Sequence, residues 1–452
     1  MADKDQSHRQ SRSPLERSRR LHPYYRGKIQ MMPKVPIRDL ADLSVWYTPG
    51  TAAAAEAVRD DPAASFEYTN RANTIAVISD GSRVLGLGDI GPAAGMPVME
   101  GKALLFKYLG GVDAMPLCLD VADTESLIRT VKALEPSFGG INLEDISKPC
   151  CFRALERLRT ELDIPVWHDD QEGTATVVTA ALINALHRVG KSPETARIAM
   201  VGMGAANFAN YRLLKHFGVD PGRVIACDSR GILHPGRSDL EAEAGSCPEK
   251  WQVCRETNAE GRQGGKAEAL EGADVCIAFS CPGPGSIRPE WVAGMAADAV
   301  VFACANPVPE IWPDEAKQAG ARIVATGRGG FPNQLNNSLA FPGLFRGVLD
   351  VRARDISNDM ALAAARELAA FVRERGISDD DILPRMDEWA VFPRVALVTA
   401  RTAVRQGLAR EGLDEGTYLD AATSRMRRAR ESLGLLMESG LIEPMPEDEE
   451  EG

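Results

Sequence analysis

Two pairs of adjacent carboxylates stand out because each lies in or directly after an apolar segment. The stretch INLEDIS contains Glu144 and Asp145, and WHDDQ contains Asp169 and Asp170. Carboxylate oxygens without a nearby set of cysteine and histidine ligands suit a hard divalent cation, Mg²⁺ or Mn²⁺. A surface pair or a helix cap is the ordinary explanation of either pair alone. Together the two pairs predict a metal site.

A lysine and a tyrosine could act with such a site. Lys102 follows a glycine in PVMEGKALLF, at the predicted start of a helix, and Tyr47 lies on a predicted turn in SVWYTPGTA. Each has a simpler explanation, as a solvated lysine and a packed tyrosine. Ligands in open α/β sheets bind at the carboxyl ends of strands, so repeated polar residues at predicted strand ends favour one shared site. His168 lies next to the second carboxylate pair, but a lone histidine is more often structural than a ligand.

A glycine-rich turn predicts a dinucleotide site. In ARIAMVGMGAANFANYRLLKHFG the turn lies between an apolar strand and an amphipathic helix, where a pyrophosphate can approach the backbone and the helix N-terminus. The next predicted strand, RVIACD, ends in an acidic residue placed to bind the adenosine ribose, which favours NAD, while Arg230 keeps NADP open. A glycine turn without a ligand is the alternative. The predicted cofactor-binding residues are Gly202, Gly204, Ala205, Ala206, Asn207 and Asp228.

The elements around these residues predict an α/β fold. Segment 28–163 mixes apolar runs and glycine turns, including a predicted hairpin around Asp80-Gly81, and forms an N-terminal α/β domain. Strands and helices then alternate over 164–390, which predicts a Rossmann-type domain with a parallel sheet. Segment 391–440 is predicted to form C-terminal helices. A disordered tail is expected at 1–27 and an acidic tail at 441–452.

Composition excludes several classes of function. The chain has 452 residues and a formal net charge of -12, which argues against nonspecific binding to nucleic acid. No apolar stretch reaches the length of a membrane span. The nine cysteines show neither a Cys-x-x-Cys pair nor a disulfide framework, and the N-terminus lacks an apolar signal segment. We therefore expect a cytoplasmic protein with reduced thiols.

A series of longer motifs runs in one order from about Lys28 to about Arg366: YTPG, DGSRVLGLGDIGP, PVMEGKA, GVDAMPLCLD, INLEDIS, HDDQ-x-GTA, CANPVPE and ATGRGGFPNQLNN-x-x-AFPG. Together they resemble the malic enzyme family in its bacterial short form. The resemblance implies oxidative decarboxylation of malate to pyruvate and CO₂, with NAD(P)⁺ and Mg²⁺ or Mn²⁺. It also implies a homodimer or higher homo-oligomer, in keeping with the prevalence of two-fold assemblies.

The resemblance also implies roles for the acidic residues and the lysine. Glu144, Asp145 and Asp170 match metal ligands of the family, where the ion acts as a Lewis acid on malate. Lys102 matches the general base that takes the proton of the C2 hydroxyl, which requires its pKa to fall. Asp169 matches the residue that orients this lysine.

Further roles follow from the same resemblance. Tyr47 matches the acid that protonates C3 of the enol, and Arg83 matches the arginine that pairs with a substrate carboxylate. Asn306 and Asn337 match asparagines that contact substrate and nicotinamide, with Asn336 adjacent to the second.

The sequence departs from the family pattern in three places. Glu172 stands where histidine is usual, so an extra carboxylate could tighten or distort the metal site. Asn207 replaces Gly or Ala in the glycine fingerprint, which affects helix packing more than phosphate contact. Thr51 replaces valine near Tyr47, a mild change.

Three other functions stay open. A malolactic enzyme would recycle bound NAD and release lactate, and another relative would act on a different 2-hydroxy diacid. A catalytically silent nucleotide-binding protein is the non-enzymatic alternative. The intact set of predicted catalytic residues argues against the last one.

Overall fold

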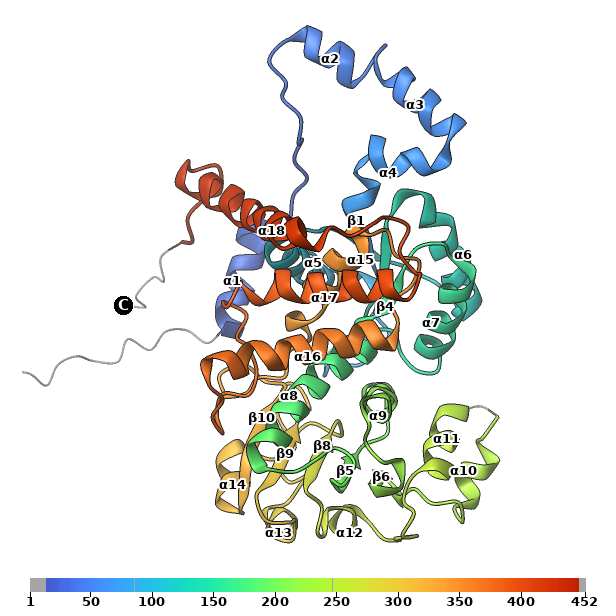
Figure 1. Ribbon diagram of the computed structural model, residues 1–452, viewed down its shortest axis with the longest axis vertical. Helices are drawn as coiled ribbons and strands as arrows, with labels where there is room; N and C mark the ends of the chain where they lie inside the picture. The colour runs from blue at the N-terminus through green and yellow to red at the C-terminus, as the bar shows by residue number, and fades with distance from the viewer. Residues whose placement is uncertain (1–13, 85, 246, 447–452) are drawn as a thin grey trace, which may run out of the picture.

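The structure, a computed structural model, describes residues 14–84, 86–245 and 247–446, and its framework is two separate β-sheets (Figure 1). The strands of the first sheet run parallel in the order β2-β1-β3-β4, and helices form the crossovers that parallel strands require. In chain order the elements are β1 (Thr74–Ser79), α5 (Gly91–Gly110), β2 (Asp113–Cys118), α6 (Thr124–Leu134), β3 (Gly140–Leu143), α7 (Cys150–Glu161) and β4 (Val166–His168).

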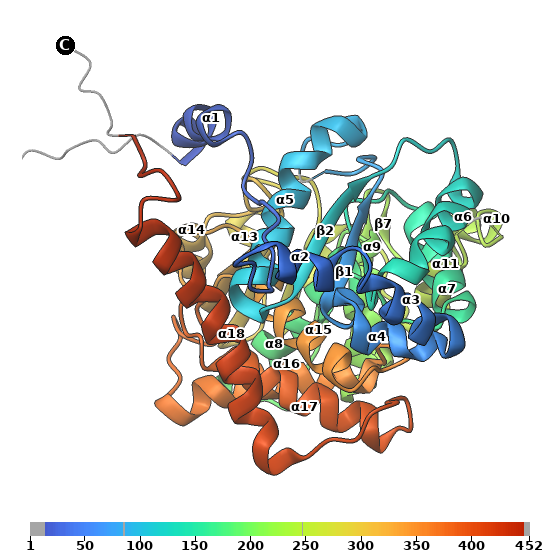
Figure 2. The same cartoon turned by 90° about the horizontal axis from the view of Figure 1, so that it is seen from above.

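Helices cover both faces of the first sheet, with α5 on one side and α6 and α7 on the other (Figure 2). One face packs on α6 and α7 through buried side chains such as Ile78, Leu127 and Leu158. On the other face lies α5, whose Phe106 ring packs 4.4 Å from that of Phe341, measured between centroids. Burial of such side chains is the main favourable term in holding the layers together.

The second sheet has the strand order β10-β9-β8-β5-β6-β7, with only β7 antiparallel. Its central strands are buried along their whole length, as expected for a sheet covered on both faces. The strands are β5 (Ile198–Val201), β6 (Val224–Asp228), β7 (Gly231–Ile232), β8 (Val275–Ala278), β9 (Ala299–Ala303) and β10 (Ala321–Thr326). The helices are α8 (Thr174–Val189), α9 (Ala205–Phe217), α10 (Ser238–Ala242), α11 (Pro248–Glu256), α12 (Lys266–Leu270), α13 (Pro289–Ala293) and α14 (Pro313–Gln318).

The C-terminal helices join the two sheets. They are α15 (Phe341–Asp350), α16 (Asn358–Arg375), α17 (Val391–Arg405) and α18 (Glu415–Glu438). Helix α16 packs on α8 of the second sheet, whereas α15, α17 and α18 pack on α5 of the first. The chain therefore returns to the first sheet after completing the second sheet.

An arm of four short helices precedes the first sheet. These are α1 (Pro14–Tyr25), α2 (Leu40–Trp46), α3 (Thr51–Asp60) and α4 (Ser65–Tyr68). Figure 1 shows α2 and α3 projecting from the top of the molecule, away from both sheets. Neither helix contains a buried residue. The position of this arm bears on the candidate site below.

The predicted α/β fold with a Rossmann-type domain is confirmed, and the five strands predicted between 196 and 327 correspond to β5, β6, β8, β9 and β10. The predicted hairpin around Asp80-Gly81 is wrong. Both edges of β1 are taken by parallel partners, β2 and β3, and the following residues form turns that lead into α5.

Three other boundaries differ from the prediction. Residues 14–25, which are expected in a disordered tail, form α1. The Tyr25 hydroxyl at the end of this helix donates to the Glu443 carbonyl at 2.9 Å. The rest of the two predicted tails, residues 1–13 and 447–452, lies outside the described chain. Lys102 lies inside α5 rather than at a helix start, because the buried residues at 95, 99, 102 and 106 follow a helical period. Strand β4 lies beyond the predicted boundary at 163/164, yet it pairs with β3 of the first sheet.

The close packing of α15 on α17 depends on Gly347. A Cβ at this position would lie 2.5 Å from the Ala396 carbonyl oxygen, so Gly347→Ala should lower the free energy of unfolding by about 1–3 kcal/mol through overpacking. The matched control is Gly434→Ala in α18, where a Cβ meets no atom within 4 Å and should stabilise the helix by about 0.5–1 kcal/mol. Urea unfolding followed by circular dichroism measures both effects; equal midpoints would contradict the assigned packing.

Candidate active site

The carboxyl ends of β3 and β4 lie side by side and carry both acidic pairs. Leu143, the last residue of β3, pairs in register with His168, the last residue of β4. Glu144-Asp145 and Asp169-Asp170 therefore leave the same edge of the first sheet. Adjacent parallel strands are separated by about 4.8 Å, which is close enough for side chains to share ligands. The structure thus brings together two pairs that are 25 residues apart, as shown by the 2.8 Å hydrogen bond from the Asp145 amide to Asp170 Oδ2.

Lys102 reaches this edge from α5. Its Nζ lies 2.6 Å from Asp169 Oδ2 and 3.0 Å from Glu144 Oε1. All three side chains are buried. A buried charge is costly unless it is paired and hydrogen-bonded, and here the ammonium group meets two carboxylates at once. The lysine is therefore fixed at the edge of the sheet.

Three neighbours that the sequence reasoning missed hold this cluster in place. Asn142 Nδ2 donates to Glu144 Oε2 at 2.9 Å, and Trp167 Nε1 donates to Asp169 Oδ1 at 3.2 Å. The Phe341 ring centroid lies 4.5 Å from the lysine Nζ, within the range of a cation–π contact. The signal for the first two was present, because each precedes its carboxylate by two residues and so lies on the same face of an extended chain.

The electrostatics of the cluster keep the lysine charged. Burial by itself lowers the pKa of Lys102, but the carboxylates of Asp169 and Glu144 outweigh burial, so the pKa lies above its usual value. Burial raises the pKa of Glu144, and the like charges of Asp170, Asp169 and Asp145 raise it further against the opposing effect of the lysine. Four carboxylates therefore face one ammonium group, which leaves an excess of negative charge.

This excess of charge and the chemistry of the donors fit a divalent cation. Glu144, Asp145 and Asp170 offer only carboxylate oxygens, the ligands preferred by Mg²⁺ and Mn²⁺. Asp145 has φ 54°, a left-handed conformation that turns the chain directly after Glu144. In the described residues no group of three His, Cys, Asp or Glu side chains is already arranged around a metal position. The carboxylates are therefore suitable donors that a cation would have to draw together.

The predicted substrate and nicotinamide contacts lie around this edge. The Arg83 amide donates to the Asp145 carbonyl at 3.0 Å, and its exposed side chain leaves from the turn after β1. Asn306 follows β9 and is exposed; a Cβ on Gly86, in the same turn as Arg83, would lie 2.7 Å from its carbonyl oxygen. Loops from the two sheets therefore meet at Asn306.

The two adjacent asparagines have different surroundings. Asn337 opens a short 3-10 helix, η6 (Asn337–Leu339), and its Cβ would lie 3.3 Å from a Cβ on Gly173, at the end of the acidic turn. Asn336 instead caps this helix, accepting from the Ser338 amide at 3.0 Å. This arrangement favours Asn337 as the one that faces the site.

Tyr47 is not brought into the cluster. It ends α2 on the projecting arm, and its side chain is 74% exposed. Within the described chain its contacts are backbone hydrogen bonds of the arm, from its amide to Leu43 and to its carbonyl from Thr51, both at 2.9 Å. Lys102 and Tyr47 of the same chain therefore do not share a site.

The glycine-rich turn lies where the strand order of the second sheet reverses, between β5 and β8. Gly202 has φ 87°, and a Cβ there would collide with the Phe279 carbonyl, so only glycine fits. Gly204 precedes α9 and a Cβ there would meet no atom within 4 Å, which leaves the helix N-terminus open to an anion. Ala205 and Ala206 are the first residues of that helix.

Asn207, which departs from the glycine fingerprint, is held by several buried hydrogen bonds. Its buried Nδ2 donates to the carbonyls of Val201, Gly202 and Ile277 at 3.1, 2.8 and 3.3 Å, and its Oδ1 accepts from Asn210 at 3.0 Å. The amide thus joins α9 to both strands that flank the turn. Close helix packing, which a small residue usually provides, is achieved here by hydrogen bonds.

Comparison with known proteins identifies the family. Residues 26–129 match the family Malic enzyme, N-terminal domain, and residues 171–404 match Malic enzyme, NAD binding domain. The chain belongs to the malic enzyme family. It is therefore an oxidoreductase with an NAD(P)-binding domain.

Individual malic enzymes share most of this chain. The Bifunctional malic/malolactic enzyme of Bacillus subtilis is 45% identical over 88% of this chain and 95% of its own length. The NAD-dependent malic enzyme of Geobacillus stearothermophilus is 47% identical over 85% of this chain and 78% of its own. The crystal structure of the Entamoeba histolytica malic enzyme superposes with a TM-score of 0.93 at 46% identity, covering 96% of this chain and 90% of the other. Other relatives are named NADP-dependent malic enzymes.

Two further features of this malic enzyme concern its cysteines and its helices. All nine cysteines lie in the described chain and are free. Within the same residues, no helix is both long and apolar enough to cross a membrane.

Glu172, which departs from the family pattern, is part of an ion pair. The acidic turn forms one turn of π-helix, η4 (Asp169–Gly173), and Glu172 leaves it toward α7, where its Oε1 lies 2.7 Å from Arg159 Nη1. Arg159 also donates to the Ile356 carbonyl at 2.9 Å. The Glu172 carboxylate thus anchors the acidic turn to α7 and to the loop before α16, which favours a structural role for it.

Removing Arg159 should destabilise the fold. Arg159→Ala leaves the mostly buried Glu172 without its cation and should lower the free energy of unfolding by about 2–4 kcal/mol. The double variant Arg159→Met/Glu172→Leu should recover most of this loss, because an apolar pair replaces the ion pair. Chemical denaturation measures both variants, and isothermal titration with Mn²⁺ checks the site. A Glu172→Leu protein of normal stability but altered Mn²⁺ affinity would show that Glu172 acts on the metal instead.

Proposed function

We propose that this malic enzyme oxidises malate and decarboxylates it to pyruvate and CO₂, with reduction of NAD(P)⁺ and with Mg²⁺ or Mn²⁺ bound. The observation that carries the proposal is the buried Lys102, held by Asp169 and Glu144 at the edge of the first sheet beside the loops that reach the second. The names of the relatives support malate as the substrate. A lysine among carboxylates is a suitable acid–base group for a hydroxy acid bound through a cation.

Lys102 is the proton acceptor in this proposal. Glu144, Asp145 and Asp170 would hold the cation, which supplies Lewis-acid polarisation of the C2 oxygen of malate. When their charges are neutralised, the carboxylates hold the Lys102 proton less tightly, so its pKa falls toward the range a base requires. Asp169, which is buried and accepts a hydrogen bond from Trp167, orients the Lys102 amine toward the C2 hydroxyl of malate.

The substrate is positioned by three further side chains in this proposal. Arg83 has an exposed side chain and pairs with a malate carboxylate through its guanidinium fork. Asn306 and Asn337 approach from the second domain and hold the substrate and the nicotinamide close together, so that the C2 hydrogen faces the ring. NAD(P)⁺, when bound, would supply the acceptor for this hydrogen as hydride.

The role of Lys102 is tested by substitution along one helix. Lys102→Ala should lower kcat for malate-dependent cofactor reduction by about 10²–10⁴-fold, the usual contribution of a general acid–base group. Lys107→Ala, on the same helix, removes an exposed lysine paired with Asp113 and should retain activity. Absorbance at 340 nm, with Mn²⁺ and again with EDTA, gives the rates. Unchanged activity in Lys102→Ala, or full activity in EDTA, would contradict the mechanism.

A second function is favoured by one relative, the Bifunctional malic/malolactic enzyme of Bacillus subtilis. In a malolactic reaction CO₂ would leave first, the reduced cofactor would then return its hydride to pyruvate, and lactate would be released. The same assay separates the two functions, because pyruvate accumulates in proportion to reduced cofactor in the first and lactate accumulates without it in the second. Other 2-hydroxy diacids, tested in place of malate, define the substrate range.

We also propose a homodimer in which Tyr47 acts in the partner's site. After α1, the arm leaves the first domain at Lys28, whose amide donates to Glu100 Oε2 on α5 at 3.1 Å. The residues that follow expose a series of apolar side chains. A monomer rarely leaves so many apolar side chains of one segment uncovered. A second copy is the partner that fits, since most soluble assemblies are two-fold. The exposed large apolar side chains of residues 29–47 in this arm are Ile29, Met31, Met32, Ile37, Leu40, Leu43, Val45, Trp46 and Tyr47.

Mixed dimers test the origin of the tyrosine. Tyr47→Phe and Lys102→Ala should each be nearly inactive, but their refolded mixture should regain about a quarter of the wild-type activity, because half the dimers are mixed and one of their two sites is intact. Tyr68→Phe, which changes another exposed tyrosine, is the control and should remain active. Sedimentation gives the assembly state. A mixture no more active than its components would place both residues in one chain.

A further inference from the structure

The carboxyl end of β6 lies at the rim of the dinucleotide site. Val201 of β5 pairs in register with Cys227 of β6, and the Gly202 amide donates to the Cys227 carbonyl at 2.9 Å. Asp228, the next residue, is therefore beside the glycine-rich turn. In this fold the side chain at the end of the second strand faces the adenosine ribose, where an acidic residue selects NAD and a cation accommodates the 2′-phosphate of NADP.

Asp228 has no acceptor capacity left for a ribose hydroxyl. Its Oδ1 accepts from the Arg230 amide and from Arg237 Nη1, both at 2.8 Å. Its Oδ2 accepts from Arg237 Nη2 at 3.3 Å and lies 2.5 Å from Lys250 Nζ. An ionised carboxylate has about four lone-pair positions, and these four donors use them all. The side chain is also 9% exposed, so it is held behind the surface rather than presented to a ligand.

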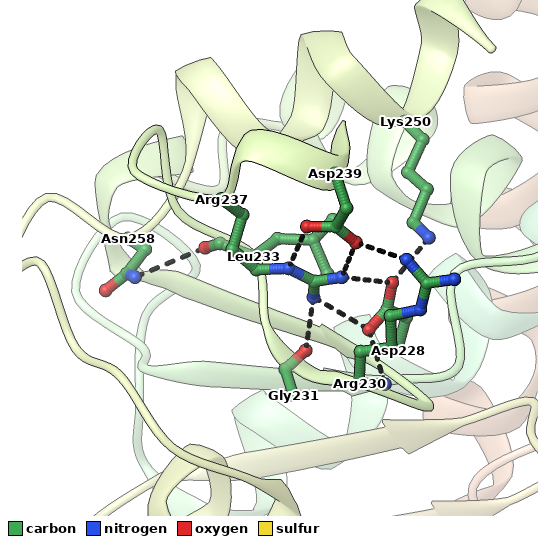
Figure 3. Close-up of polar contacts among 8 residues, drawn as sticks. All are labelled: Asp228, Arg230, Gly231, Leu233, Arg237, Asp239, Lys250 and Asn258. Atoms are coloured by element: carbon green, nitrogen blue, oxygen red, sulfur yellow. Dashed lines mark hydrogen bonds and ion pairs between the residues drawn. The ribbon is translucent and has the colours of Figure 1, made fainter. Parts of the chain in front are cut away.

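Among the residues ion-paired with Asp228 or Asp239, cations outnumber carboxylates; Figure 3 shows how these side chains converge. Arg230, Arg237 and Lys250 surround Asp228 and Asp239, which leaves one net positive charge. The Arg230 guanidinium pairs with Asp239 at 3.0 Å, yet its side chain is 64% exposed and lies in the turn between β6 and β7. The surface beside the ribose position is therefore basic, although its strand ends in an aspartate.

We propose that this surface binds the 2′-phosphate of NADP and that the enzyme prefers NADP⁺ to NAD⁺. The inference rests on the proposed function only in that the cofactor serves the malate reaction. Arg230 contacts the phosphate through its guanidinium fork, and Lys250 supplies a second cation from α11. Arg237 is a positioning residue, because it holds Asp228 away from the phosphate and cancels its charge. NAD⁺ lacks the phosphate that these cations would bind, and the Asp228 carboxylate that would accept from its ribose is already engaged.

Binding without malate tests the proposal independently of catalysis. The dissociation constants of NADP⁺ and NAD⁺ are measured by isothermal titration calorimetry on the intact enzyme, with wild type, Arg230→Gln, Lys250→Gln and Arg427→Gln. The wild type should bind NADP⁺ at least about tenfold more tightly than NAD⁺, the difference expected from charge-assisted contacts to one phosphate. The first two variants should each weaken NADP⁺ binding by about tenfold and leave NAD⁺ binding within about twofold.

One variant serves as the control, and two results would overturn the proposal. Arg427→Gln removes an exposed arginine of α18 that pairs with Glu431, far from the second sheet in Figure 1, and should change neither constant. Equal or tighter binding of NAD⁺ by the wild type would overturn the proposal, as would equal losses for both cofactors in Arg230→Gln. Normal NADP⁺ binding without malate-dependent reduction would instead contradict the proposed function and leave the phosphate site standing.

Discussion

The contact of one buried ammonium group with two buried carboxylates is the constraint on which the rest of this structure depends. Lys102 can be buried only because Glu144 and Asp169 both reach it, and both do so only because β3 and β4 end in register. A shift of one residue between these strands would turn the carboxylates to opposite faces of the sheet. The first domain is therefore organised as much around this charge cluster as around its apolar layers.

The C-terminal helices also contribute to this cluster. Phe341 opens α15 and lies beneath the lysine, while Arg346 of the same helix is buried and bonded to Asn73, just before β1. Close approach of α15 to α17 at Gly347 keeps this helix in place. Helix α15, which follows the second sheet, thus completes the lysine site although it lies within the NAD binding domain, so the two domains cannot be treated as separate catalytic and cofactor modules.

Much of this arrangement could be predicted from sequence, and the failures have physical reasons. The parallel strands of the second sheet are predictable because each is a short, mostly apolar run ended by a glycine, a proline or a polar residue. The turn after β1 was mistaken for a hairpin because Asp80-Gly81 has the local chemistry of one, whereas the neighbours of β1 come from distant segments. For the site, residue types indicated Lys102 and the acidic pairs, but not the partner of Glu172 or the saturation of Asp228, since Arg159 and Lys250 are brought in by tertiary folding alone.

Asn207 shows what the glycine fingerprint actually requires. The third position demands a short distance between helix and strand, and the buried amide meets that demand by donating to carbonyls of both neighbouring strands. The rule is thus one of separation rather than of side-chain size. A search pattern that admits only Gly or Ala at this position would pass over chains that meet the requirement with an amide, and nucleotide-binding proteins of this kind would be under-counted in genome surveys.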